Sequence, residues 1–122
     1  MERSLMSDLL AWYQKTNRKP LIIRGARQVG KTWLMQEFGS RYFKQVVYIN
    51  FDREKRLHDF LEESIEPKRL LTAFEAISGK TIHAQDTLII LDEIQEEPRA
   101  LSALKYFCEE TPHIAIMAAS SL

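Results

Sequence analysis

A run of eight residues near the amino end of the chain limits its fold more than any other feature. Residues 25–32 read GARQVGKT, which fits the spacing G-x-x-x-x-G-K-[ST]. This spacing is typical of the loop that holds the phosphates of a nucleoside triphosphate, provided that a strand precedes it and a helix follows. The sequence therefore predicts a strand, a phosphate-binding loop and a helix in succession.

The residues on both sides of the loop meet this condition. Residues 20–24 contain the apolar run Leu-Ile-Ile and are expected to form a short strand. After the loop, Leu34, Met35 and Phe38 recur at helical spacing, and we expect Gly39 to end this helix at its C′ position. A glycine-rich turn that binds nothing is the alternative interpretation, and the flanking pattern disfavours it.

Each residue type in the loop suits one part of a bound triphosphate. Gly25 lets the chain leave the strand in a conformation that side chains disfavour, and Gly30 permits close approach of the backbone to a phosphate. The N–H groups between them are expected to form a nest for anions at the positive end of the following helix. Lys31 suits the β- and γ-phosphate oxygens, and Thr32 offers its hydroxyl to Mg²⁺. The predicted nucleotide-binding residues are Gly25, Ala26, Arg27, Gln28, Val29, Gly30, Lys31 and Thr32.

A second informative stretch ends in two adjacent carboxylates. Residues 88–91 are Leu-Ile-Ile-Leu, which is typical of a parallel strand covered on both faces, and Asp92 and Glu93 follow. Carboxylates at the mouth of a buried strand are costly unless cations or hydrogen-bond donors meet them. We predict that Asp92 holds Mg²⁺ with Thr32, mostly through water, and that Glu93 polarises the water that attacks the γ-phosphate. Helix capping is the alternative, but the phosphate loop about 60 residues earlier favours the magnesium site.

Composition argues against several other classes of protein. Lysine plus arginine equals aspartate plus glutamate at 17 each in 122 residues, so nucleic acid and anionic membranes are not expected partners. No apolar run approaches the roughly 20 residues that span a bilayer. The single cysteine, Cys108, cannot form an internal disulfide, which fits a reducing cytoplasm. His58 and His83 have no Cys or His nearby at ligand spacing, so we expect neither to bind a metal.

The whole sequence predicts alternating strands and helices. Strands are expected at residues 21–24, 46–51, 88–92 and 114–119. Helices are expected at residues 4–16, at residues 53–79 in two pieces split at Pro67, and at residues 96–110. We interpret residues 1–122 as a single α/β domain, in which residues 1–19 form an N-terminal helix and a connector.

Polar residues at two places allow more than one interpretation. Asp52, at the carboxyl end of the second strand, either orients a catalytic water or caps the following helix, and capping is favoured. Arg18 and Lys19, before the first strand, either approach a bound nucleotide or belong to a solvated loop, and the loop is favoured.

The motifs taken together resemble those of a known family. Residues 25–32 (GARQVGKT), 91–95 (LDEIQ) and 118–122 (AASSL) are similar to those of the AAA-type P-loop ATPases of bacteria and archaea. In that family the P-loop domain is usually followed by a C-terminal domain of unknown function. The resemblance implies a three-layer α/β sandwich with a mainly parallel sheet in the strand order 5-1-4-3-2. It also implies the additional-strand, catalytic-glutamate class of ATPases.

The same resemblance implies roles for individual residues. Lys31 and Thr32 are expected to contact phosphate and Mg²⁺, Asp92 to contact Mg²⁺, and Glu93 to act as the general base, with ATP as the nucleotide. Ser121 falls where relatives carry a polar residue that senses the γ-phosphate, although they often read Ala-Gly-Ser-Leu where this chain has Ala-Ser-Ser-Leu. Three further residues match the family without an assigned role: Arg27, Gln28 and Gln95.

The family fold also includes elements that this sequence does not supply. A fifth strand beside the first, a helical lid and a charge-neutralising arginine are expected there, so the chain looks like the truncated N-terminal part of such a protein. The first strand is then expected to be an open sheet edge, available to a second copy or a partner chain.

Two functions follow from these predictions. One is Mg-dependent ATP hydrolysis, and the other is a nucleotide-binding or assembly module without turnover. A GTPase is disfavoured because the sequence has no Asn-Lys-x-Asp motif. Kinases and helicases share the phosphate loop, so the loop alone does not exclude them.

Overall fold

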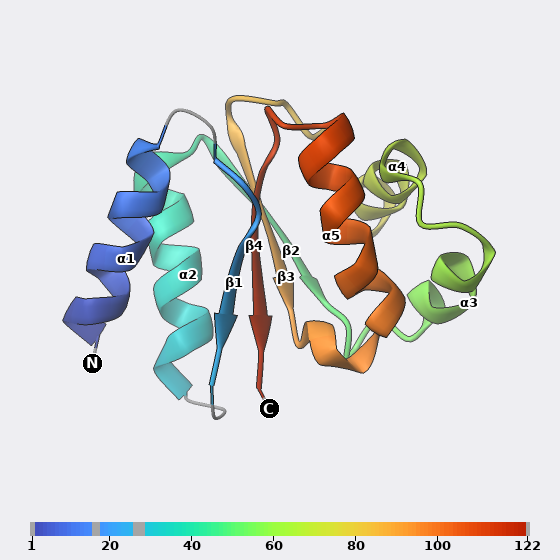
Figure 1. The fold of residues 1–122 in the computed structure, drawn as a ribbon, viewed down its shortest axis with the longest axis horizontal. Coiled ribbons are helices and arrows are strands. Elements are labelled where there is room, and N and C mark those ends of the chain that lie inside the picture. Colours follow the sequence, from blue (N-terminus) through green and yellow to red (C-terminus); the bar gives the residue numbers. More distant parts are fainter. Residues whose placement is uncertain (1, 16–17, 26–28, 122) are drawn as a thin grey trace.

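The computed structural model describes residues 2–15, 18–25 and 29–121, and its centre is a parallel sheet of four strands. The sheet order is β1-β4-β3-β2, and every neighbouring pair runs parallel (Figure 1). The strands are β1 (Leu21–Arg24), β2 (Gln45–Asn50), β3 (Thr87–Asp92) and β4 (Ala115–Ser120). The four predicted strands are confirmed to within one residue at each end, and the order matches the 1-4-3-2 part of the expected topology.

The two central strands owe their position to their apolar sequences. Every residue of β3 and β4 is buried, because helices cover both faces of the sheet at these strands. β1 alternates between half-buried and exposed residues, and within the described residues it pairs with β4 alone. Ile22 of β1 is 36% exposed. The expectation that β1 forms an open edge therefore holds for the part of the chain that the structure describes.

Helices form a layer on each side of the sheet, as the prediction of a three-layer sandwich requires (Figure 1). One layer is α1 (Glu2–Gln14) with α2 (Val29–Tyr42), whose buried residues Leu9, Met35 and Phe38 pack against Ile90 and Met117. The other layer consists of α3 (Arg56–Glu63), α4 (Pro67–Ser78) and α5 (Pro98–Glu110), and the short 3-10 helix η1 (Ile94–Glu96) links β3 to α5. In residues 2–15, 18–25 and 29–121 we find no helix with the length and apolar character needed to cross a membrane.

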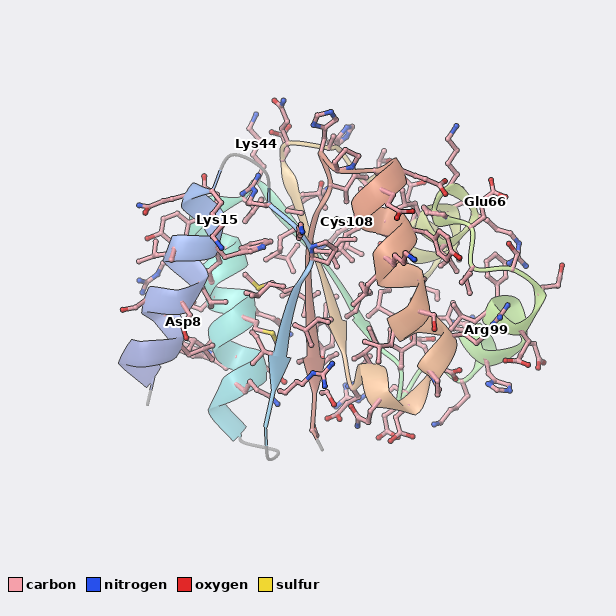
Figure 2. The ribbon with its side chains drawn as sticks, in the orientation of Figure 1. Asp8, Lys15, Lys44, Glu66, Arg99 and Cys108 are labelled. Carbon is pink, nitrogen blue, oxygen red and sulfur yellow. The ribbon has the colours of Figure 1, made fainter. Side chains whose placement is uncertain are left out.

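The second layer is joined by polar contacts as well as by its apolar core. Arg99, which is labelled in Figure 2, lies at the start of α5. Its Nε donates to the carbonyl oxygen of Leu61 in α3 at 3.2 Å. The predicted break between α3 and α4 lies at Pro67, which occupies the first turn of α4. Gly79 ends α4 with φ of 72°, as expected for a glycine after a helix.

The predicted end of α2 at Gly39 is wrong. The helix continues to Tyr42, and Gly39 is buried inside it. A Cβ atom at this position would lie 2.5 Å from Val46 Cγ2 and 3.0 Å from Leu88 Cδ2. The glycine is therefore needed for the close approach of α2 to β2 and β3, and not for a left-handed conformation.

We expect Gly39→Ala to destabilise the protein although alanine is the better helix former. Alanine in a helix gains roughly 0.5–1 kcal/mol over glycine, whereas overpacking a filled core costs about 1–3 kcal/mol. Val46 is β-branched and cannot easily move aside, so we expect a net loss of about 1 kcal/mol in urea unfolding. Ser40→Ala, on the exposed side of the same helix, is the control and should change stability little. A Gly39→Ala variant as stable as Ser40→Ala would contradict this explanation.

Candidate functional site

The two sequence motifs meet at the carboxyl ends of the strands. Arg24, the last residue of β1, pairs with Ser120, and Asn50, the last residue of β2, pairs with Asp92. The amino end of α2 lies at this same end of the sheet (Figure 1). Ligands of open α/β sheets bind at the carboxyl ends of the strands. Ala26, Arg27 and Gln28 lie outside the described residues, and α2 begins at Val29.

Gly25 has the backbone conformation that the motif predicts. Its φ is +150°, a value that residues with side chains rarely adopt. Its N–H donates to the carbonyl oxygen of Ser120 at 3.2 Å, which ties the start of the loop to the end of β4. Gly30 lies in the first turn of α2 and is half-buried.

Lys31 is a buried cation at the start of α2. The residue is 8% exposed, and its Nζ donates to the same Ser120 carbonyl oxygen at 3.2 Å. An ammonium group carries three donors, and the structure gives Lys31 no carboxylate partner among the described residues. A buried ammonium without a paired anion favours an anionic ligand.

Thr32 and Asp92 join the two motifs directly. The Thr32 hydroxyl donates to Asp92 Oδ2 at 2.8 Å, across 60 residues of sequence. Asp92 is 3% exposed, and the Glu93 N–H donates to its other oxygen, Oδ1, at 3.0 Å. A hydroxyl and a carboxylate oxygen at this spacing are a fitting pair of ligands for Mg²⁺, which takes few protein oxygens and keeps several waters.

Tyr48 is a third member of this cluster that sequence reasoning missed. Its hydroxyl donates to Asp92 Oδ2 at 2.6 Å, the same oxygen that Thr32 contacts. Burial, together with the hydrogen bond to Asp92, raises the pKa of Tyr48 to about 12. The phenol therefore remains a donor at neutral pH and orients the Asp92 carboxylate.

We expect Tyr48→Phe to weaken the binding of Mg²⁺ at the predicted site without unfolding the protein. Loss of a group that orients a metal-binding carboxylate typically costs about 10- to 100-fold in metal affinity or activity. A titration of Mg²⁺ at fixed ATP should show an apparent affinity lowered by about 10-fold. Tyr106→Phe removes the hydroxyl of a residue on α5 that is 39% exposed, and it should have no effect. Equal titration curves for the two variants would rule out a role for Tyr48.

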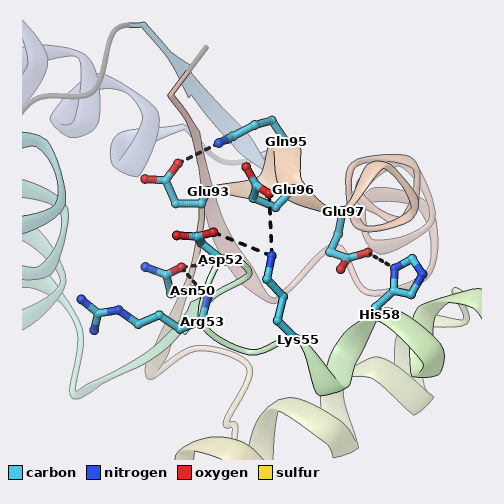
Figure 3. A network of polar contacts seen from close by, with 9 residues as sticks. All are labelled: Asn50, Asp52, Arg53, Lys55, His58, Glu93, Gln95, Glu96 and Glu97. Carbon is cyan, nitrogen blue, oxygen red and sulfur yellow. Dashed lines mark hydrogen bonds and ion pairs between the residues drawn. The ribbon is translucent and has the colours of Figure 1, made fainter.

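Glu93 follows Asp92 in an unusual backbone conformation. Its φ of 53° and ψ of 45° are left-handed, and among the described residues it is the one non-glycine residue with positive φ. Such conformations cost of order 1 kcal/mol or more and are concentrated at functional sites. Glu93 is half-buried as a residue, and Gln95 Nε2 donates to its Oε1 at 2.8 Å (Figure 3).

Ser121 lies where the resemblance predicted it, at the end of the strand between the two motif strands. It directly follows β4, which pairs with β1 on one side and β3 on the other. The residue is half-buried, and its N–H donates to Gln95 Oε1 at 3.2 Å. Whether its hydroxyl contacts a phosphate stays a prediction.

The favoured interpretation of Asp52 as a helix cap is wrong. α3 begins at Arg56 with Lys55 as its N-cap, and no side chain caps it. The Asp52 carboxylate instead lies 3.7 Å from the Lys55 ammonium (Figure 3). Asn50 organises this turn, because its Oδ1 accepts the N–H groups of Asp52 at 2.9 Å and Arg53 at 3.2 Å.

Arg18 does not lie near the motifs. Its guanidinium packs over the rings of Trp12, Tyr13 and Phe43 at 5.5, 5.2 and 5.8 Å. It also lines a pocket with His113 and residues at the amino end of β4, the opposite end of the sheet from Ser120. Arg18 therefore does not contact a nucleotide bound in the predicted loop. It also differs from the expected solvated loop, because the residue is partly buried.

His58 contacts Glu97, which lies two residues after the acidic motif. Its Nδ1 lies 3.0 Å from Oε1 of Glu97, whose side chain is 4% exposed (Figure 3). This hydrogen bond and the charge of Glu97 raise the pKa of His58 above its usual value of 6.5. In the part of the chain that the structure describes, no three His, Cys, Asp or Glu residues form a group able to hold a metal ion.

The raised pKa of His58 predicts a pH-dependent stability. The contribution of the pair is complete below pH 6.5 and is lost as pH rises through the higher pKa of the folded state. In urea unfolding, His58→Gln should therefore lower stability more at pH 5.5 than at pH 9. His113→Gln changes an exposed histidine and should show no such difference. A His58→Gln effect that grows with pH would contradict the assignment.

Comparison with known proteins identifies the class to which this fold and site belong. The family model for an AAA domain matches residues 17–122. Over 84 residues the chain is 29% identical to the replication factor C large subunit of Methanosphaera stadtmanae, a match that covers 68% of this chain and 14% of that protein. The structure of C. elegans PCH-2 is similar with a TM-score of 0.56 and 13% identity, over 99% of this chain and 37% of that one.

The chain belongs to the AAA domain family, since the family model covers most of its length. The likeness to PCH-2 supports the fold of this family, an AAA-type P-loop arrangement of helices around a parallel sheet. Family membership supports an ATP-binding, AAA-type function. The chain spans a small part of the replication factor C subunit and about a third of the PCH-2 chain.

Proposed function

We propose that this chain binds ATP with Mg²⁺ and hydrolyses the γ-phosphate in the cytoplasm. The observation that carries the proposal is the 2.8 Å hydrogen bond from Thr32 to Asp92, because it brings the phosphate-loop helix and the acidic strand end into one site. We further propose that residues 1–122 act as a single P-loop domain, with residues 1–19 as its N-terminal helix and connector.

Some residues of the site bind the nucleotide and the metal, and others take part in the reaction. Residues 25–32 hold the triphosphate, with the Lys31 ammonium on the β- and γ-phosphate oxygens. Thr32 and Asp92 hold Mg²⁺, which offsets the charge that develops on the phosphate oxygens. Glu93 accepts a proton from the attacking water, and its place directly after Asp92 at the end of β3 suits a general base. Ser121 contacts the γ-phosphate from the end of β4.

Phosphate release tests this proposal. The chain at micromolar concentration should release phosphate from ATP in the presence of Mg²⁺ and should stop when EDTA removes the metal. Release that continues unchanged in EDTA would contradict the magnesium-dependent mechanism. Binding of Mg-ATP without any phosphate release would contradict hydrolysis while leaving the binding site in place.

A second candidate function is a nucleotide-binding or assembly module without turnover. The edge of β1 favours it, because within the described residues β1 pairs on one side alone and exposes Ile22. Exposed strand edges pair readily with other chains. Sedimentation with and without Mg-ATP tests this function: nucleotide-dependent association without phosphate release would favour it, and a monomer that releases phosphate would exclude it.

A further inference from the structure

Gln95 makes two side-chain hydrogen bonds that join separate parts of the site. Its Nε2 donates to Glu93 Oε1 at 2.8 Å (Figure 3). Its Oε1 accepts the N–H of Ser121 at 3.2 Å. A carboxylate needs a donor and an N–H needs an acceptor, so one orientation of the amide satisfies both partners. The side chain thus bridges the residue after β3 to the residue after β4.

The hydrogen bond to Ser121 connects Gln95 to the phosphate loop through the adjoining peptide group. The Ser121 N–H and the Ser120 carbonyl belong to one peptide group, which is planar and rigid. The Ser120 carbonyl oxygen accepts hydrogen bonds from Lys31 Nζ and from the Gly25 N–H, each at 3.2 Å. One peptide group therefore contacts the loop lysine through its oxygen and Gln95 through its nitrogen.

We propose that Gln95 is a positioning residue that holds the Glu93 carboxylate and couples its orientation to Lys31 through the Ser120–Ser121 peptide group. This inference rests on the proposed function of Glu93 as general base. A shift of the Lys31 ammonium toward a phosphate changes the hydrogen bonding of the Ser120 oxygen, and rotation of the rigid peptide group then moves the N–H that Gln95 accepts. The Gln95 amide is neutral, so its hydrogen bond orients the carboxylate without itself adding a charge.

Turnover experiments separate positioning from simple structural support. Gln95→Met keeps the length of the side chain and removes both hydrogen bonds, whereas Gln95→Glu keeps an acceptor for Ser121 and places a second carboxylate beside Glu93. For Gln95→Met we expect the single-turnover rate to fall about 10- to 100-fold, with the Kd for Mg-ATP within about 2-fold of wild type. For Gln95→Glu the acid limb of the rate–pH profile should move to higher pH, because a like charge raises the pKa of a neighbouring carboxyl.

Gln85→Met is the matched control, since Gln85 is exposed before the amino end of β3. It should leave the rate, the Kd and the pH profile unchanged. A Gln95→Met variant with the wild-type rate and pH profile would overturn the proposal and leave hydrolysis intact. A variant that merely lost thermal stability, with an unchanged rate at a temperature where it is folded, would overturn the proposal as well.

An NMR experiment decides the proposal even if wild type binds Mg-ATP without turnover. The side-chain amide signals of Gln95 should shift in Glu93→Gln, where the carboxylate acceptor is lost, and also in Lys31→Ala, where Ser120 loses a donor. The Ser121 backbone amide should shift in Gln95→Met. Gln95 signals that stay unchanged in both Glu93→Gln and Lys31→Ala would overturn the coupling, independently of any hydrolysis.

Discussion

Lys31→Ala is expected to abolish measurable binding of Mg-ATP by this chain. Hydrogen bonds to charged groups contribute about 1.5–3 kcal/mol each, and the Lys31 ammonium is buried beside the Ser120 carbonyl at the start of the phosphate-loop helix. Loss of two such bonds to phosphate oxygens costs about 3 kcal/mol or more, which corresponds to at least about a 100-fold higher Kd. Isothermal titration of the variant with Mg-ATP measures this change.

The control for Lys31→Ala is Lys105→Ala. Lys105 is exposed on α5, so this variant makes the same change in net charge away from the strand ends. Circular dichroism of both variants checks that the lost bond to Ser120 has not unfolded the protein. If folded Lys31→Ala binds Mg-ATP as tightly as Lys105→Ala does, the lysine has no role in phosphate binding.

Glu93→Gln is expected to retain nucleotide binding and to lose hydrolysis. General-base catalysis contributes about 10²- to 10⁴-fold in rate, and glutamine keeps the size of the side chain but cannot accept the proton. The Kd for Mg-ATP should stay within a few-fold of wild type, because Lys31, Thr32 and Asp92 are unchanged. Single-turnover phosphate release measures the loss.

Glu96→Gln provides a matched comparison for Glu93→Gln. Glu96 is an exposed acid three residues away, and its carboxylate lies 3.8 Å from the Lys55 ammonium (Figure 3). The Glu96→Gln variant should hydrolyse ATP at nearly the wild-type rate. Equal rates for wild type and Glu93→Gln would overturn the role of general base for Glu93.

The arrangement of the strands could be predicted because the apolar runs and the order of the two motifs agreed. The apolar run before Asp92 indicated a buried parallel strand, the apolar run before Gly25 indicated a short strand, and both lie in the sheet where expected. Parallel strands place their carboxyl ends at one edge, so the proximity of Thr32 to Asp92 followed from the order of the motifs.

The errors at Gly39 and Asp52 have different physical causes. A glycine near the end of an apolar helical pattern and an acid before a helix are local signals for a helix end and a helix start. Glycine is needed at position 39 because α2 packs closely against Val46. At Asp52 the Asn50 side chain already accepts the backbone N–H groups of the turn, so Asp52 does not cap α3. The packing at Gly39 depends on the tertiary fold, whereas the hydrogen bonds of Asn50 are local and reach two and three residues along the chain.

The positioning contacts of the site escaped prediction for a related reason. Tyr48 looks like an ordinary residue of a buried strand, and the reach of its hydroxyl to Asp92 depends on the pairing of β2 with β3. Gln95 was noted in the motif, but its contact with Ser121 depends on the end of β4, and Ser121 lies 26 residues later in the chain. Such contacts require the register of the sheet, which local patterns do not determine.

The most direct test of a magnesium–nucleotide site at the carboxyl ends of β1, β3 and β4 is a calorimetric titration of the folded wild-type chain with ATP, in Mg²⁺ and in EDTA. We predict saturable binding with one ATP per chain, weaker in EDTA. A flat titration in Mg²⁺, from a sample whose circular dichroism shows that it is folded, would contradict the central claim.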